Sequence, residues 1–352
     1  MRRLVERSRR PIGVDIGERQ IRAVQLNLSS DRWRIKAAAS LPRAMPGSRV
    51  SGAEVHRLHG LLDRKGFTGK SIVLAVPNDK LLTGVLELPP RTSGAPIEQL
   101  ARSEFARMHQ WDAQSFEIAC WDLPAPGRAT NSTFVMAAAC THAGADELLD
   151  AFEGEGFDVR GLDTRATAAA RACGPLLADV SGIAAILDIG WTSAQLVLWY
   201  EGVVVYERNL PKGGLGALAK LLPSDRGTDL RQVARVPVEN APTGAGAGAG
   251  SSGDLPHELL EPTAAHFENI VQEMRIPLSY VANQYPDAAM ERLLLIGDGA
   301  GIPGLKAHLA SALELAVHIV APADLADYPE TVGCEPDASL TVAVGLGQFA
   351  ER

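Results

Sequence analysis

The feature that most constrains the fold is a motif that occurs twice. An apolar segment ending in Asp-Ile-Gly occupies residues 12–17, and a second copy occupies residues 185–190. After each copy, apolar and polar residues alternate, a short polar turn follows, and the alternation resumes, which predicts two further strands. Two three-stranded meanders that open with the same turn predict one duplicated α/β domain.

The two Asp-x-Gly turns also contain residues suited to binding phosphate and Mg²⁺. A glycine lets backbone amides approach a phosphate, and a carboxylate can hold hydrated Mg²⁺. In two facing halves, Asp15 and Asp188 would flank one polyphosphate and hold Mg²⁺ through water. The predicted phosphate residues are Asp15, Gly17, Asp188, Gly190, Thr192 and Ser193. The plainer alternative, that both aspartates only form turns, explains the duplication less well.

A third motif lies late in the chain, where an apolar strand, a glycine-dense turn and a helix follow one another over residues 293–315. The turn matches GxGxxG, but no acidic ribose partner follows about 20 residues later, so we reject a Rossmann dinucleotide site. We expect Gly297, Gly299 and Gly301 to let the nucleoside of a nucleotide lie against the backbone.

The order of these motifs suggests a domain organisation. We expect a basic tail over residues 1–10, a first half over 11–180 with a small module near 80–155, and a second half over 181–352. A Gly/Ala-rich insertion at 237–256 is predicted to be a flexible surface segment. A helix is predicted over 259–284, with Pro262 in its first turn and Pro277 kinking or breaking it.

Composition narrows the class of partner. The formal net charge is −8 and no basic cluster follows the tail, which argues against nucleic acid as a partner. The arginines of the tail could touch anionic lipid, although a solvated tail is the simpler reading. The four cysteines are widely spaced and the histidines form no ligand pattern, as expected of a reduced cytoplasmic protein. No apolar run reaches the length of a membrane span.

With these motifs in this order, the chain resembles the PilM family of type IV pilus assembly proteins, within the actin-like ATPases. The similarity is carried by residues 11–26, 135–171, 184–214 and 293–322. The resemblance implies an α/β fold of the actin-like (ribonuclease H-like) ATPase class, with two duplicated lobes and a small inserted α+β subdomain. It also implies ATP and Mg²⁺ in the interlobe cleft, with Gly213 beside the phosphates.

The resemblance further implies a partner and a location. Family members bind the N-terminal cytoplasmic peptide of PilN, a single-span inner-membrane protein. We therefore expect a cytoplasmic adaptor, peripheral at the inner membrane through its partner, with a peptide groove beside the module at 80–155.

Several residues depart from the family pattern. Glu18 and Arg19 stand where relatives place Ser or Thr, and a carboxylate beside phosphate repels it, although Arg19 can donate to phosphate. Arg165 stands where relatives tend to carry Glu, and it cannot act as a base. Asp298 replaces a small residue. These changes predict nucleotide binding with little hydrolysis, and no catalytic residue can be named.

Other readings of the sequence remain open. A sugar-kinase-type phosphotransferase of the same superfamily would need a carboxylate base, for which the first half offers no convincing candidate. An FtsA-like scaffold or a type II secretion component would share the fold. A degenerate scaffold that binds no nucleotide is a further alternative, and the sequence also leaves self-association open.

Overall fold

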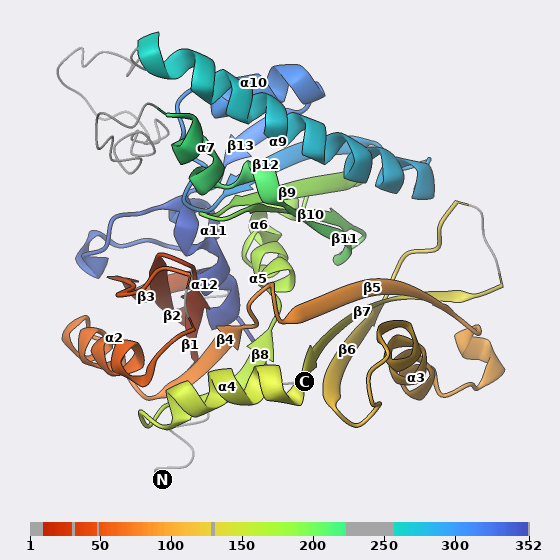
Figure 1. Cartoon of the computed structure of the whole chain (residues 1–352), viewed down its shortest axis with the longest axis horizontal. Coiled ribbons are helices and arrows are strands. Elements are labelled where there is room, and N and C mark those ends of the chain that lie inside the picture. The colour runs from red at the N-terminus through yellow and green to blue at the C-terminus, as the bar shows by residue number, and fades with distance from the viewer. Residues whose placement is uncertain (1–9, 30–31, 48, 128–130, 223–256, 351–352) are drawn as a thin grey trace.

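In the part of the chain that the structure describes, three β-sheets form, with helices layered around them (Figure 1). The computed structural model describes residues 10–29, 32–47, 49–127, 131–222 and 257–350. The predicted insertion at 237–256 lies outside these residues, and so does the predicted tail apart from Arg10. Two sheets have five strands each and the third has three.

The first five-stranded sheet comes from the first half of the chain. Its strands are β1 (Ile12–Ile16), β2 (Gln20–Ser29), β3 (Arg32–Pro42), β4 (Ser71–Ala75) and β8 (Asp158–Asp163). They lie in the order β3-β2-β1-β4-β8. β2 pairs antiparallel with both β1 and β3, which confirms the first predicted meander. β1, β4 and β8 run parallel to one another.

The second five-stranded sheet repeats this arrangement. Its strands are β9 (Ile183–Ile189), β10 (Ala194–Tyr200), β11 (Val203–Leu210), β12 (Met290–Ile296) and β13 (Ala316–Ile319). The order β11-β10-β9-β12-β13 matches that of the first sheet, with an antiparallel meander joined to parallel strands. The predicted duplication is therefore confirmed at the level of topology, because β9 takes the place of β1 and β12 that of β4.

Two helices fill the space between the five-stranded sheets. α12 (Thr341–Gly347) packs on β1 and β2 of the first sheet, and α5 (Arg165–Ala172) packs on β10 and β11 of the second. The two helices also pack against each other, and one buried cluster joins both sheets through them. Small residues permit this approach: a Cβ added at Gly345 would lie 1.8 Å from the carbonyl oxygen of Ala168.

Other helices cover the outer faces of the sheets. α2 (Gly52–Arg64) and α4 (His142–Glu153) cover the first sheet, while α7 (Leu215–Leu221), α9 (His257–Gln284) and α10 (Leu305–Leu313) cover the second (Figure 1). Ser51 caps α2 in a reciprocal capping box with Glu54. Single-turn helices complete the described chain: α6 (Gly174–Leu177), α11 (Pro322–Leu325), η1 (Arg91–Ser93), η2 (Pro211–Gly213), η3 (Glu330–Val332) and η4 (Ala338–Leu340).

The third sheet forms the small module, which lies to one side of the two large sheets (Figure 1). Its strands β5 (Leu81–Leu88), β6 (Phe116–Asp122) and β7 (Thr133–Thr141) lie in the order β5-β7-β6, and α3 (Ile97–His109) covers one face around Phe105. The indole of Trp121 donates to the carbonyl of Val204 on β11 at 2.8 Å. The module therefore contacts the second half as well as the first.

Helix α9 differs from the prediction in where it begins, and it is not broken at Pro277. The helix begins at His257, so Pro262 lies inside it instead of in its first turn, and it continues through Pro277 without a break. Its inner face explains this continuity, because Ile270 and Met274 are fully buried against the second sheet. Tertiary packing of this face offsets the cost of a missing backbone hydrogen bond.

In the part of the chain that is described, no helix combines the length and the low charge that a bilayer span requires.

Candidate functional site

The predicted phosphate residues gather where parallel strands of the two large sheets end. Asp15 lies near the end of β1, Asp188 near the end of β9, and Asp298 in the turn that follows β12. Ligands of open α/β sheets bind at the carboxyl ends of such strands. The duplicated topology thus brings two acidic turns, 173 residues apart in the sequence (188 minus 15), to the junction between the sheets where the resemblance implies the interlobe cleft.

Arg165 joins the two aspartates of the duplicated turns. Its Nη1 donates to Oδ1 of Asp15, and its Nη2 donates to Oδ2 of Asp188 at 2.7 Å. Arg165 is the first residue of α5, and the side chain of Thr164 caps that helix by accepting from the amide of Thr167. Because a cation at a helix N-terminus is unfavourable by itself, the two carboxylates are what stabilise Arg165 in this position.

Burial sets the electrostatics of this bridge. Asp15 is 1% exposed, and burial raises its pKa above the ordinary value, while the charges of Arg165 and Arg22 offset only part of that effect. Burial alone would lower the pKa of Arg165, but Asp15 and Asp188 outweigh it and raise that pKa further. The guanidinium is therefore a permanent charge in the cleft.

A second ion pair crosses the cleft beside the first. Arg22 of β2 donates to Oδ1 of Asp298, and their side chains are 5% and 31% exposed. Sequence reasoning noted Asp298 as a departure but missed Arg22 altogether. The signal for it was the alternation of β2, which places Arg22 on the same face as buried apolar neighbours, where an unpaired arginine is costly.

Two further contacts join the first half to the second half at the edge of the cleft. The hydroxyl of Thr192 donates to the carboxylate of Glu18. The guanidinium of Arg19 lies over the ring of Trp191, 3.8 Å from its centroid. Thr192 and Arg19, both expected at phosphate, are thus engaged with protein groups, and Ser193 lies next to them, half-buried.

The glycines of the two Asp-x-Gly turns make equivalent turns. The amide of Gly17 donates to the carbonyl of Gln20 at 2.9 Å, and the amide of Gly190 donates to the carbonyl of Ser193 at 3.1 Å. Each of these amides therefore closes a turn instead of pointing freely into the cleft.

The glycines of the third motif, together with Gly213, allow neighbouring segments to pack closely. Gly297 has φ +86°, and an added Cβ would lie 2.2 Å from Oδ1 of Asp188. At Gly299 a Cβ would lie 2.3 Å from Cγ2 of Ile189, and at Gly213 it would lie 2.8 Å from Cβ of Ala194. These three glycines press their segments against the second Asp-x-Gly turn, and Gly301 follows in the same turn, half-buried.

The side chains of the cleft do not fit Mg²⁺ as the sequence predicted. Asp15 and Asp188, the two predicted ligands, both face one guanidinium, and a divalent cation beside it would be repelled. Within the described ranges, no group of three or more His, Cys, Asp or Glu side chains is placed to hold a metal ion.

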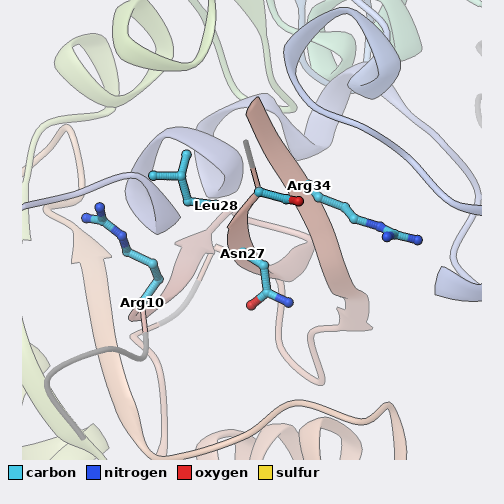
Figure 2. Close-up of a pocket in the computed structure, with 5 residues that line it drawn as sticks. Arg10, Asn27, Leu28 and Arg34 are labelled. Atoms are coloured by element: carbon cyan, nitrogen blue, oxygen red, sulfur yellow. The ribbon is translucent and has the colours of Figure 1, made fainter. Parts of the chain in front are cut away.

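A surface pocket lies away from this cleft, at the other end of β2 (Figure 2). It has a volume of about 520 Å³ and is lined by Arg10, Asn27, Leu28, Ser29 and Arg34. No residue predicted to bind nucleotide lines it. The guanidinium of Arg10 lies 5.1 Å from the ring centroid of Trp33, so this pocket borders the outer edge of the first sheet.

Comparison with solved structures supports the fold. The chain is similar to a protein in a PilM–PilN type IV pilus biogenesis complex, with a TM-score of 0.75 and 19% identity, over 97% of this chain and 98% of that chain. The ethanolamine utilization protein EutJ of Carboxydothermus hydrogenoformans matches with a TM-score of 0.48 and 13% identity, over 97% and 89% of the two chains.

Two further comparisons concern sequence. A search of curated proteins finds no match. The family model described as type IV pilus assembly protein PilM matches residues 13–347, which is nearly the whole chain. The chain therefore belongs to the PilM family of type IV pilus assembly proteins and has the actin-like fold of that family.

Proposed function

We propose that the protein is a cytoplasmic adaptor of type IV pilus assembly, held at the inner membrane by a PilN-like partner whose N-terminal tail it binds. The observation that carries the proposal is the family match over residues 13–347, together with likeness along almost the full length to the protein in a PilM–PilN complex. That likeness includes the small module, beside which the family resemblance implies the peptide groove.

We place the peptide at the junction between the first sheet and the small module. The segment after β4 carries Asn78 and Lys80, and α4 packs beside it with Glu147. Glu147 accepts from Lys80 and pairs with Arg49 at 2.7 Å. Main-chain groups of an extended peptide need such donors and acceptors.

Nucleotide has a secondary part in this proposal. The cleft between the large sheets is where the sequence predicts ATP, with Asp15 and Asp188 near the phosphates. The ion pairs of Arg165 with both aspartates oppose Mg²⁺ there. The adaptor role therefore requires neither hydrolysis nor a catalytic residue.

Fluorescence polarisation tests the adaptor proposal. A labelled synthetic peptide with the N-terminal cytoplasmic sequence of the organism's PilN-like protein should bind saturably to the wild-type protein. Lys80→Glu should weaken binding at least about tenfold, or roughly 1.4 kcal/mol. The control Lys220→Glu makes the same charge change on α7 of the second half, where Lys220 is exposed.

The outcomes distinguish the adaptor role from the location of the peptide groove. No binding of the peptide to folded wild-type protein would overturn the adaptor proposal. Equal affinity of the two lysine variants would instead move the groove away from the junction at Lys80.

A further inference from the structure

We propose that Arg165 takes the place of a divalent cation and, with three neighbouring contacts, holds the two halves of the fold together at this cleft. Arg165 contacts one carboxylate from each half, Asp15 of β1 and Asp188 of β9. A bridging Mg²⁺ between the same two carboxylates would make the same link.

The charges of the cleft are consistent with this substitution. Asp15, Asp188 and Asp298 bring three negative charges, and Arg165 and Arg22 supply two positive charges in direct contact with them. Two arginines thus supply the charge that one Mg²⁺ would bring. Because the aspartates are buried or half-buried, losing these partners would leave uncompensated charge in the interior.

All four contacts run between the two halves of the fold. Arg22 of the first sheet reaches Asp298 after β12, and Glu18 accepts from Thr192. At the rim Arg19 stacks on Trp191. The turn after β1 and the start of β2 therefore attach to the second half at separate points, through ion pairs, a hydrogen bond and a cation–π contact.

The bridge also excludes a metal ion. Mg²⁺ loses its waters reluctantly and needs carboxylate oxygens that are free to coordinate. Here those oxygens accept from a guanidinium, which does not lose its proton at any pH a protein tolerates. Mg²⁺ would have to displace Arg165 from Asp15 and Asp188, so the wild-type cleft should bind divalent cations weakly.

The proposal is tested by reversing one charge. In Arg165→Glu, three carboxylates would converge on the place that the guanidinium now holds, creating a metal site. The matched control is Arg275→Glu, the same change on the exposed side of α9. Thermal melting is recorded for wild type and both variants in EDTA and in increasing MgCl₂. Binding of Mn²⁺ alone is followed by the loss of its free EPR signal.

We expect wild type and Arg275→Glu to melt at the same temperature in EDTA and in Mg²⁺. Arg165→Glu should melt lower in EDTA and rise by at least about 2 °C as Mg²⁺ saturates the new site. It should also bind about one Mn²⁺ per chain in the EPR titration.

Two results would overturn the proposal. One is stoichiometric Mn²⁺ binding by wild type, which decides the question even where Arg165→Glu fails to fold. The other is a folded Arg165→Glu that responds to Mg²⁺ no more than Arg275→Glu does.

Discussion

The crossing of α5 and α12 is so close that one added methyl group should weaken the whole core. In Gly345→Ala the new Cβ would lie 1.8 Å from the carbonyl oxygen of Ala168 and 2.5 Å from its carbonyl carbon. These are main-chain atoms of a helix and cannot rotate away. The contact can be relieved only by moving the helices apart by more than about 1 Å.

The size of the effect follows from two opposing terms. Overpacking a well-packed core costs about 1–3 kcal/mol, and the upper end applies because the two helices join both sheets in one cluster. Replacing glycine by alanine inside a helix contributes about 1 kcal/mol in the other direction. We therefore expect Gly345→Ala to lower the free energy of unfolding by about 2 kcal/mol.

Urea unfolding measures this difference, followed by tryptophan fluorescence and circular dichroism. The control is Gly60→Ala within α2, where the new Cβ would meet only the end of the Arg64 side chain, at 3.4 Å. In that control the free energy of unfolding should rise by about 0.5–1 kcal/mol. Adding Ala168→Gly to Gly345→Ala should give no rescue, because the clash is with main-chain atoms. A neutral Gly345→Ala, or a rescue, would refute the reasoning.

Two further predictions concern buried groups. Burial would raise the pKa of Glu54, but hydrogen bonds from Arg43 and the amide of Ser51 outweigh burial, so the pKa lies below its ordinary value. The ionised Glu54 therefore stabilises the folded state above the ordinary pKa, and this stabilisation is lost as the pH falls. Glu54→Gln should thus cost about 3 kcal/mol at pH 7 in urea unfolding, and a gap that does not narrow towards pH 4 would contradict this. Burial raises the pKa of the Cys173 thiol, so the thiol should resist Ellman's reagent at pH 8 until urea is added, and rapid native labelling would contradict its burial.

The sequence predicted the frame of the fold because that frame depends on local patterns. The repeated Asp-Ile-Gly turn and the alternation after it are readable within about 30 residues, and both meanders form as predicted. The path of α9 through Pro277 could not be read in this way. It depends on burial of Ile270 and Met274 against a sheet formed by distant segments.

The cleft was predicted in part, because its residues were judged one at a time. Glu18, Arg165 and Asp298 each stood out as a departure from the family pattern. One positive and two negative side chains at one cleft predict ion pairs among themselves, yet the partner of Asp298 is Arg22, which breaks no motif. The pairing of these charged side chains depends on the distance between the two halves, and that distance cannot be predicted from a single sequence.

The position of α12 has a consequence for the order in which the protein forms during synthesis. This helix, at residues 341–347, packs on β1 and β2, and a Cβ at Gly13 would lie 2.1 Å from the carbonyl oxygen of Ala343. The apolar face carrying Val24 and Leu26 therefore stays uncovered until more than 300 further residues have left the ribosome. Contacts so distant in sequence slow folding and expose aggregation-prone surface, so the nascent first half should depend on chaperones until α12 arrives.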